Sequence, residues 1–491
     1  MEAKVKTVDV SAGKPVIILN KEEAAKGSIF LGDRVCIEYK GSNEAAIVDL
    51  SDGVPFGNIF LFDETRKDLG VEEGEVVNIE PIIKPDSVDY IRKRVKRGEL
   101  KEGETFSIVK DAVDFRLTDS ELMAYTVALE MTDFSIKEAE DITRAMVETG
   151  ETIDVENAFD KHCIGGVPGN RTTPIVVSIV AAAGYKIPKT SSRAITSPAG
   201  TADTMEVITD IKHSIDEIED IVEKTNGCFA WGGSLNLAPA DDEFIRVRES
   251  LDLDPLEQLL SSVLAKKKAV GAETVLIDIP MGKEAKVQDQ EEAKKFSKHF
   301  KELGRKLDMD VLTIISEGSQ PIGKGIGPAL EAKDILKILE SGGKEGPGDL
   351  KEKSVKMADI LLEEGNGDRT AKEILESGDA YEKFKEIVDA QGCHAKSSKE
   401  IELANHSYTV KSEKSGRVES VSNEAVKNIA KATGCPKQKK AGIYLHKKKG
   451  DPVEEDGELM TIYSETEKML HRAVELSEKH KVYSLKSLLS K

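Results

Sequence analysis

A glycine-rich segment that runs directly into an apolar helical pattern constrains this chain more than any other feature of its 491 residues. The segment Lys161 to Thr173 (KHCIGGVPGNRTT) precedes the apolar run Pro174 to Ala183. Glycines let backbone N–H groups approach an anion closely, and a helix N-terminus carries about half a positive charge. The segment lacks the Gly-Lys-Ser/Thr of a Walker A loop and the acidic partner of a dinucleotide-binding motif. It therefore predicts a phosphate-binding loop, with a plain structural connection as the alternative.

A second loop with similar chemistry follows one structural unit later. Residues Ser191 to Glu206 (SSRAITSPAGTADTME) are rich in hydroxyl groups and again precede a helical pattern. Between the loops, residues 174–189 predict a helix, a turn at Gly184 and a short extended segment. Two such loops could flank a substrate with two phosphate groups, or a phosphate beside a phosphorylated sugar. The alternative is two connections rich in N-cap residues, because Ser, Thr and Asp favour helix starts.

Four segments, in this order, give the chain its resemblance to a known family: KHCIGGVPGNRT, SSRAITSPAGTADTMEV, GGSLNLAPAD and SSVLAKKKAVGAETVLIDIPMG. The chain resembles the thymidine and pyrimidine-nucleoside phosphorylases over essentially its whole length. Pyrimidine-nucleoside members typically carry Ser after Lys-His and a Gly-His-Thr-Gly-Gly-Thr second loop. Here those positions hold Cys163 and the run Thr196 to Thr201 (TSPAGT). These departures make the chain more similar to the archaeal AMP phosphorylase branch of the family.

The resemblance implies a reaction. The expected activity is phosphorolysis of nucleoside 5′-monophosphates by orthophosphate, which yields the free base and ribose 1,5-bisphosphate, in nucleotide salvage or degradation. AMP is the expected main substrate, and CMP and UMP are further candidates. The enzyme would be a pentosyltransferase with orthophosphate as co-substrate, no cofactor and no metal. The expected partners are these small molecules and further copies of the chain, as a homodimer or higher homo-oligomer.

The resemblance also assigns roles to residues. His162 matches the catalytic imidazole of the family, and Asp254 matches the acid that protonates the leaving base in the AMP branch. The positions that match phosphate-holding residues are Lys161, Thr173, Ser191 and Thr201. The positions that match substrate-binding residues are Gly169, Ile195, Thr196, Ser197, Pro198, Ala199, Gly200, Thr204, Arg248, Ser262, Lys266 and Lys286.

The chemistry of this reaction suits the residue types. Cleavage of an N-glycosidic bond leaves negative charge on the departing base, so a general acid such as Asp254 would stabilise it if burial raises the pKa of its carboxyl. Phosphate itself is the nucleophile, and fixed donors need only position it. Ser262 and Lys266 lie four residues apart, hence on one helix face. Without the resemblance, Asp254 before Pro255 reads as a helix cap, and Ser262 and Lys266 as part of a solvated stripe.

Two other chemistries are disfavoured. Cys163 beside His162 could act as a nucleophile, but no third group that would orient the pair is apparent. As a phosphate ligand, a thiol is a weaker donor than the usual Ser hydroxyl. The eight histidines and five cysteines are scattered without the spacing of metal ligands.

Composition limits the remaining possibilities. A net charge of −20 disfavours binding to nucleic acid or anionic membranes. Scattered cysteines, no apolar run of about 18 residues and no signal-peptide core at the N-terminus predict a cytoplasmic protein.

A chain of this length is expected to form several domains, and the pattern predicts a multidomain α/β protein. A small β-rich N-terminal module covers 1–84, an all-α domain 85–155 plus 240–270, a central α/β phosphate- and nucleotide-binding domain 156–239 plus 271–344, and a C-terminal α+β domain 345–491. The discontinuity of the α domain is implied by the resemblance.

Three other functions stay open from the sequence. A pyrimidine-nucleoside phosphorylase would not need the 5′-phosphate. A phosphoribosyltransferase such as the anthranilate enzyme would use diphosphate and normally Mg²⁺. A non-catalytic nucleotide sensor or scaffold would bind AMP without turnover. The sequence leaves open the preferred base, the loop that holds the 5′-phosphate and the role of the N-terminal module.

Overall fold

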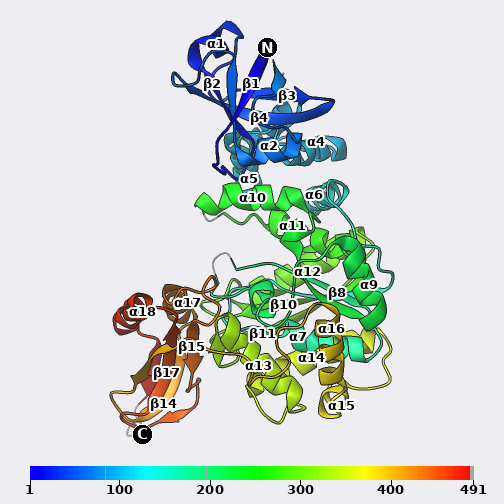
Figure 1. Ribbon diagram of the computed structural model, residues 1–491. Helices are drawn as coiled ribbons and strands as arrows, with labels where there is room; N and C mark the ends of the chain where they lie inside the picture. The colour runs from blue at the N-terminus through cyan, green and yellow to red at the C-terminus, as the bar shows by residue number, and fades with distance from the viewer. Residues whose placement is uncertain (83, 195–196, 252, 487–491) are drawn as a thin grey trace. The chain divides into compact units, whose positions relative to one another are not determined.

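The computed structural model describes residues 1–491 except 83, 195–196, 252 and 487–491 (Figure 1). The chain forms two compact units, and each contains two separate stretches of sequence. The first unit comprises Met1–Gly150 and Ala238–Ser262, and the second comprises Glu151–Leu237 and Val263–Lys491. The protein is therefore multidomain, as its length predicts.

The first unit begins with a closed β-barrel of strand order β1-β5-β2-β4-β3-β6. Its apolar side chains alternate along the strands, so that Val35 and Ile37 are fully buried inside the barrel. This is the β-rich N-terminal module that the sequence pattern predicts. The strands are β1 (Glu2–Thr7), β2 (Val16–Asn20), β3 (Arg34–Tyr39), β4 (Ser42–Ser51), β5 (Asn58–Leu61) and β6 (Val76–Pro81), with helices α1 (Lys21–Lys26) and α2 (Asp63–Leu69).

A helical bundle follows the barrel in the same unit. Its helices are α3 (Ser87–Val95), α4 (Glu102–Val113), α5 (Asp119–Glu130), α6 (Ile136–Glu148) and α10 (Pro239–Arg248). Thr118 starts α5 with a capping box, because its hydroxyl accepts from Glu121 N while the Glu121 carboxylate accepts from Thr118 N. Helix α10 packs against α4 and α5, and the rings of Tyr125 and Phe244 lie 5.9 Å apart. The helical part is thus built from two stretches of sequence.

The second unit contains a parallel sheet of order β11-β10-β7 and a parallel pair β8-β9. Phe159 N donates to Lys186 O at 2.8 Å, which links β7 to the segment that leads into β8. The strands are β7 (Ala158–Cys163), β8 (Ile187–Ser191), β9 (Gly227–Trp231), β10 (Ala272–Met281) and β11 (Asp310–Glu317). Both glycine- and hydroxyl-rich loops leave from the carboxyl ends of parallel strands, β7 and β8, where open α/β sheets bind ligands.

Helix α7 (Thr173–Ala182) is the centre of this α/β core. Every residue from Thr173 to Ala181 is buried, so the helix needs apolar partners on all sides. The other helices of this region are α8 (Thr201–Met205), α9 (Ile215–Thr225), α11 (Leu256–Ala269), which crosses from the first unit into the second, α12 (Gln290–Lys306) and α13 (Pro328–Glu340), with short 3-10 turns η1 (Gly232–Ser234) and η2 (Glu249–Leu251).

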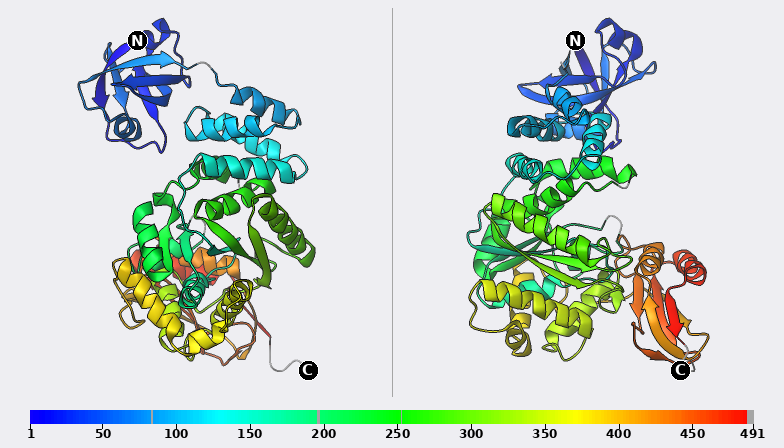
Figure 2. Two further views of the ribbon diagram at one scale, coloured as in Figure 1. Left: turned by 90° about the vertical axis from the view of Figure 1, so that its right-hand side faces the viewer. Right: turned by 180° about the vertical axis from the view of Figure 1, so that it is seen from behind.

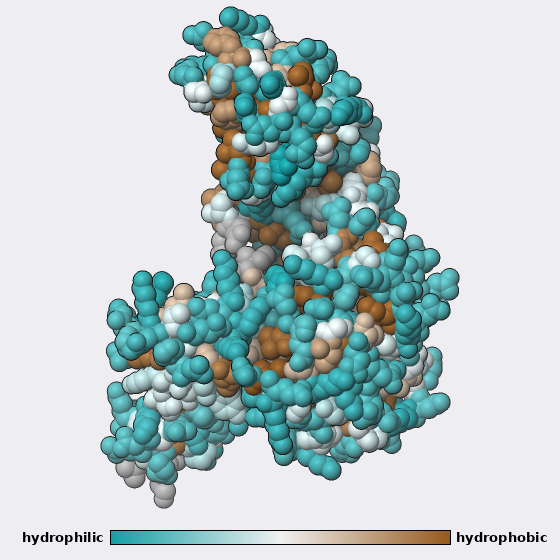
Figure 3. All heavy atoms as spheres, in the orientation of Figure 1, coloured by the Kyte–Doolittle hydropathy of each residue, from teal (hydrophilic) through white to brown (hydrophobic). Residues whose placement is uncertain are grey.

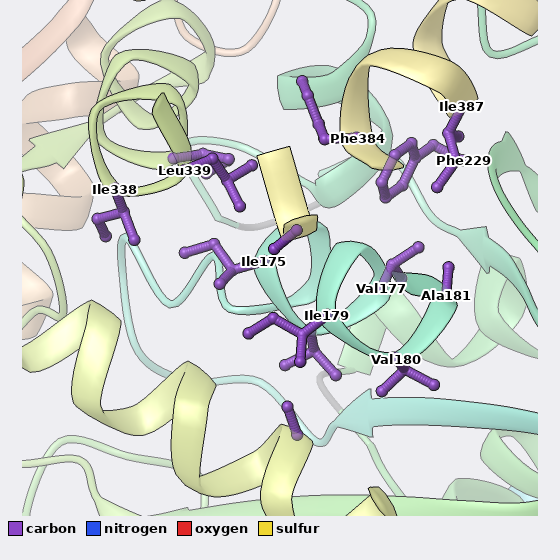
Figure 4. Packing of buried hydrophobic residues seen from close by; sticks show 14 of the residues in the cluster. Ile175, Val177, Ile179, Val180, Ala181, Phe229, Ile338, Leu339, Phe384 and Ile387 are labelled. Carbon is purple, nitrogen blue, oxygen red and sulfur yellow. The ribbon is translucent and has the colours of Figure 1, made fainter. Parts of the chain in front are cut away.

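The α/β core continues past the boundary expected at 345, which corrects that prediction. Helices α14 (Gly348–Glu364), α15 (Ala371–Glu376) and α16 (Asp379–Ala390) belong to the same hydrophobic core as α7. Figure 4 shows Phe384 and Ile387 close to Phe229 and to the side chains of α7. The glycine-rich stretch 342–348 is a tight connection in which Gly342, Gly343 and Gly346 have positive φ, not a linker between domains.

The C-terminal domain combines two antiparallel sheets with two helices on its own core, as expected for an α+β domain. One sheet has the order β12-β15-β17-β13 and the other β16-β14-β18. The elements are β12 (Gly325–Ile326), β13 (His406–Lys411), β14 (Gly416–Val421), β15 (Gly442–Leu445), β16 (Pro452–Val453), β17 (Glu458–Ser464), β18 (Tyr483–Lys486), α17 (Asn423–Ala432) and α18 (Glu467–Lys479). Figure 2 shows this domain, in orange and red, beside the α/β part of the second unit.

Strand β12 ties the C-terminal domain to the α/β part. It precedes α13 in the chain, yet it pairs with β15 of the C-terminal sheet. The second unit is therefore held together by backbone pairing as well as by side chains. Within the part of the chain that the structure describes, no helix is long and apolar enough to cross a membrane.

The extension of the core to α16 can be tested by truncating Phe384. We expect Phe384→Ala to destabilise the α/β core by about 3–5 kcal/mol, because the fully buried ring leaves a cavity beside Phe229. Amide hydrogen exchange should then quicken in α7 and β9 while the N-terminal barrel keeps its protection. Glu386→Ala, which removes an exposed side chain of the same helix, is the control. Unchanged exchange in α7 would contradict the shared core.

Candidate functional site

Lys161, where the first loop begins, contacts the N-terminal end of α7. The Lys161 side chain is 1% exposed, and its Nζ donates to Thr172 Oγ1 at 2.6 Å and to Thr173 Oγ1 at 3.4 Å. Burial lowers the pKa of its ammonium group from the ordinary value. Lys161 and Thr173, both predicted to hold phosphate, are thus brought together, and Thr172 joins them without having been singled out from the sequence.

A buried polar cluster around Asp278 supports this loop. Asn170 Nδ2 donates to Asp278 Oδ2 at 3.1 Å, Ser316 Oγ donates to Asp278 Oδ1 at 2.5 Å, and Lys353 Nζ lies 2.8 Å from Asp278 Oδ2. Burial acts to raise the pKa of the Asp278 carboxyl, but Lys353 and Lys161 outweigh it and hold that pKa below its ordinary value. With Lys161 protonated, the cluster carries more positive than negative charge, which suits an anion.

Sequence reasoning missed Asp278, Ser316 and Lys353. A signal for Asp278 was present, because it is the one charged residue in the apolar strand segment Val275 to Met281. Such a residue is buried only with partners. No comparable signal marks Lys353, which lies on an ordinary amphipathic helix, α14.

His162 lies on the opposite face of β7 from Lys161, since side chains alternate along a strand. On that same face, Asp160 is fully buried between Lys189 Nζ at 2.9 Å and Lys267 Nζ at 2.6 Å. Burial, and after it Lys267, Lys189, Lys161 and Lys266, lowers the pKa of His162 well below its ordinary value. The imidazole is therefore neutral at neutral pH and can donate one hydrogen bond and accept another.

Cys163 is a protonated thiol in this environment. Burial, with Asp278 nearby, raises the pKa of Cys163 to about 11. Its Sγ accepts hydrogen bonds from Gly165 N at 3.4 Å and from Asn170 Nδ2 at 3.1 Å. These contacts hold the first loop in place. The raised pKa leaves almost no thiolate near neutral pH, which argues against a cysteine nucleophile.

Arg171 connects the first loop to the second. Its guanidinium donates to Ala199 O at 2.8 Å, to Thr201 Oγ1 at 2.8 Å and to Glu331 Oε2 at 2.7 Å. Thr204 Oγ1 donates to the same Glu331 oxygen at 3.2 Å. The structure therefore brings together residues of both loops, as expected if the two loops serve one substrate. Arg171 and Glu331 are further residues that sequence reasoning did not single out.

The remaining predicted residues of the second loop have simpler surroundings. Ser197 Oγ donates to Ala199 O at 3.1 Å, and Ser191 Oγ donates to Ala230 O at 3.3 Å. Pro198 is buried, and Gly200 precedes α8. The predicted residues Ile195 and Thr196 lie outside the described part of the chain.

Two glycines of the first loop are required by close contacts. A Cβ on Gly169 would lie 2.2 Å from Ile322 O, and one on Gly166 would lie 2.7 Å from Lys286 N. Both glycines have positive φ, +71° and +92°. The predicted substrate residue Gly169 is thus packed against the backbone of the 322–325 segment. The backbone of Lys286 lies directly against the first loop at Gly166, and Lys286 is exposed.

In the first unit, Arg248 and Asp254 form an ion pair. Arg248 Nη1 lies 3.2 Å from Asp254 Oδ1, and Ser262 Oγ donates to Asp241 Oδ2 at 2.7 Å. Helix α11 begins at Leu256, so Asp254 precedes the helix by two residues and is not its N-cap residue. Arg248, Asp254 and Ser262 belong to the first unit, whereas Lys266, His162 and both loops belong to the second.

No metal centre is apparent in the part of the chain that the structure describes. Among those residues, no group of three or more His, Cys, Asp or Glu side chains is placed to hold a metal ion. The charged clusters around Asp160 and Asp278 instead pair each carboxylate with lysines. Their chemistry suits an anionic ligand above them more than a bound cation.

Family models match three parts of the chain. Residues 88–150 match the helical bundle domain of a glycosyl transferase family, and residues 155–381 match the a/b domain of that family. Residues 417–484 match the C-terminal domain of pyrimidine nucleoside phosphorylases. The a/b match extends through α14 and α15, in agreement with the core that includes these helices.

Curated relatives cover nearly the whole chain. AMP phosphorylase 1 of Archaeoglobus fulgidus is 42% identical over 96% of this chain and 95% of its own. The AMP phosphorylases of Thermococcus kodakarensis and Methanocaldococcus jannaschii are 43% and 44% identical, over 97% and 96% of this chain and 96% and 95% of theirs.

Among solved structures, anthranilate phosphoribosyltransferase from Thermus thermophilus is similar in fold. It has a TM-score of 0.52 and 19% identity, and the match covers 62% of this chain and 99% of that one. At this identity the likeness concerns the fold alone. The full-length matches, from the N-terminal barrel to the C-terminal domain, establish that the chain belongs to the archaeal AMP phosphorylases of the pyrimidine nucleoside phosphorylase family.

Proposed function

We propose that this protein is a pentosyltransferase that cleaves AMP by phosphorolysis. Orthophosphate attacks C1′ of the ribose, the N-glycosidic bond breaks with its electron pair going to the base, and the products are adenine and ribose 1,5-bisphosphate. The observation that carries the proposal is the bridge from Arg171 to both Ala199 and Thr201, because it joins the two anion-binding loops into one site. The full-length similarity to AMP phosphorylases supports the choice of substrate.

The first loop would hold the attacking orthophosphate. The ammonium of Lys161, the hydroxyls of Thr172 and Thr173, and the backbone N–H groups at the start of α7 all converge there. Each is a donor fixed by the fold, so the phosphate meets an environment that needs little reorganisation. Because phosphate is the nucleophile, the protein supplies position and charge and forms no covalent bond.

The second loop would receive the 5′-phosphate and ribose of the nucleotide. Ser197, Thr204 and the backbone from Pro198 to Gly200 offer hydroxyl and N–H donors, and Gly169 lets the first loop pack closely. The guanidinium of Arg171 holds Ala199 and Thr201 in a fixed position relative to Thr173. The neutral imidazole of His162 would hydrogen-bond to the sugar or phosphate rather than pair with it ionically.

Asp254 would protonate the departing base. In this structure its carboxylate is paired with Arg248, so this role requires Asp254 to leave that contact and take up a proton from solvent before it donates one to the base. Arg248, Ser262 and Lys266 would hold the base, and Lys286 would contact the nucleotide. CMP and UMP are further proposed substrates. We also propose that the enzyme needs no cofactor beyond orthophosphate as co-substrate, is cytoplasmic and assembles as a homodimer or larger homo-oligomer.

The substrate panel tests the proposed function. Base release from AMP, CMP, UMP, adenosine and thymidine is measured by chromatography with and without orthophosphate. We expect phosphate-dependent release from AMP, with adenosine at least about tenfold slower in kcat/KM because it forfeits the contacts to the 5′-phosphate. Faster release from thymidine would instead identify a pyrimidine-nucleoside phosphorylase. AMP binding without turnover would indicate a sensor.

Lys161 tests the phosphate site. Lys161→Met should lower kcat/KM for orthophosphate by about 10²–10³-fold, the usual loss when one fixed donor to a developing charge is removed. The change should affect orthophosphate more than AMP in saturation kinetics. Lys294→Met on helix α12, far from either loop in the sequence, is the control and should behave as wild type. Equal losses for both substrates would argue against a specific phosphate role.

Substitution of Cys163 distinguishes a positioning role of this residue from nucleophilic catalysis. Because the pKa of its thiol is about 11, the residue is not a thiolate near pH 7, and we expect Cys163→Ser to retain kcat within about threefold. The pH profile of kcat between 6 and 8 should be the same for both proteins. A loss beyond about a thousandfold in Cys163→Ser would show that the sulfur takes part in bond formation.

A further inference from the structure

The second loop is closed at its base by one carboxylate. Asp203 Oδ2 accepts hydrogen bonds from Ala194 N at 2.7 Å and from Gly200 N at 2.9 Å, and the Asp203 side chain is 3% exposed. These two donors stand at either end of the segment that carries Ser197. Gly200 must be glycine here, because a Cβ would lie 2.5 Å from Ser192 O. Asp203 therefore fixes how far apart the two ends of the loop lie.

The second oxygen of Asp203 belongs to a network of four charges. Arg193 Nη1 and Lys439 Nζ each lie 3.2 Å from Asp203 Oδ1, and each also lies 2.7 Å from Glu206 Oε2. The hydrogen bond from Arg193, assisted by Lys439 and opposed by burial, lowers the pKa of Glu206 to about 2. The network thus pairs two carboxylates with two cationic side chains, and their formal charges sum to zero.

Lys439 reaches this network from the C-terminal domain. It lies between α17 and β15, and its carbonyl oxygen accepts from Ala329 N of α13 at 3.0 Å, which anchors its backbone. The next residue, Lys440, pairs instead with Glu402 in an exposed ion pair. These neighbouring lysines thus have different surroundings: Lys439 pairs with Asp203 and Glu206, and Lys440 faces solvent.

A natural spectroscopic probe lies against the same network. Trp231, the chain's only tryptophan, ends β9, and the Arg193 guanidinium lies 4.8 Å from its ring centroid. Arg193 is thus held between the indole on one side and the carboxylates of Asp203 and Glu206 on the other. A change in this network of charges alters the environment of the Arg193 cation beside the indole, and with it the tryptophan emission.

We propose that Lys439 is a positioning residue for the nucleotide, through which the C-terminal domain holds the second loop in the form that receives the 5′-phosphate. This inference rests on the proposed function of that loop. Without Lys439, Arg193 alone faces two carboxylates, so a negative charge is left uncompensated beside the site of a dianion. The loss acts on the substrate's phosphate and not on the base or on the attacking orthophosphate.

The test compares Lys439→Met with the adjacent control Lys440→Met. We expect Lys439→Met to raise KM for AMP about three- to fivefold, the upper range for a partly exposed ion pair, with kcat within about twofold. KM for orthophosphate and the rate with adenosine should stay unchanged, and Lys440→Met should match wild type. Lys439→Arg, which keeps the charge, should restore KM for AMP to within about twofold of wild type.

Fluorescence provides an independent readout. Titration of AMP into the full-length protein should change Trp231 emission, with a dissociation constant that rises in Lys439→Met as KM does. If the methionine variant is insoluble, Lys439→Gln serves with the same expectations. Wild-type KM for AMP in both variants would overturn the inference while leaving the proposed function intact. An equal loss for adenosine, AMP and orthophosphate would also overturn it, because it would indicate a general structural role.

The proposed function can be overturned independently of the inference about Lys439. If the wild-type protein releases no base from AMP in the presence of phosphate, the activity is wrong whatever the variants do. If such an inactive protein still bound AMP, weaker binding by Lys439→Met, with unchanged binding by Lys440→Met, would support Lys439 as a determinant of nucleotide binding. Identical binding by wild type and both lysine variants would overturn it.

Discussion

The site depends on the guanidinium of Arg171, because it holds two loops that are separate in sequence in one arrangement. It is nearly buried, and a charge in that position is stable only when all its donors find partners. Glu331 supplies the opposite charge, and Ala199 and Thr201 supply oxygens from the second loop. Buried ion pairs add little net stability, so the value of this one lies in the geometry that it imposes. A lysine could not reproduce it, since it lacks the planar fork that reaches three acceptors at once.

A second constraint is electrostatic: the protein carries a net charge of −20, yet its proposed substrates are anions. Figure 3 shows hydrophilic residues over most of the visible surface. Strand β7 offsets this field locally, because each of its faces has a carboxylate flanked by lysines. On one face Asp278 lies near Lys161 and Lys353, and on the other Asp160 lies between Lys189 and Lys267. Buried charges are screened much less by salt than surface charges, so these lysines dominate at short range.

Local signals in the sequence predicted the parts of the fold and site that depend on neighbouring residues. The glycines and hydroxyls from Lys161 to Thr173 indicated a loop before a helix, and the structure places Lys161 against Thr173. The boundary at 345 was wrong because a glycine-rich stretch marks a tight turn as well as a linker. Lys353 and Lys439 could not be found, since only tertiary folding brings them to residues more than 70 positions away.

Helix α11 carries two of the residues proposed to contact the base, Ser262 and Lys266. Ser261 Oγ donates to Ala139 O in the first unit, and Lys267 Nζ pairs with Asp160 in the second, so the helix is anchored in both. Ser262 and Lys266 lie between these anchors, one turn apart on one face. Their spacing, about 6 Å between Cβ atoms, is fixed by the helix itself. The base would thus be recognised by a pair whose spacing is set by the hydrogen-bonded helix, whereas the two phosphates would depend on loops that Arg171 and Asp203 hold in place. On the proposed function, selection for the nucleotide over the nucleoside would therefore reside in those loops, where buried charges and not secondary structure set the geometry.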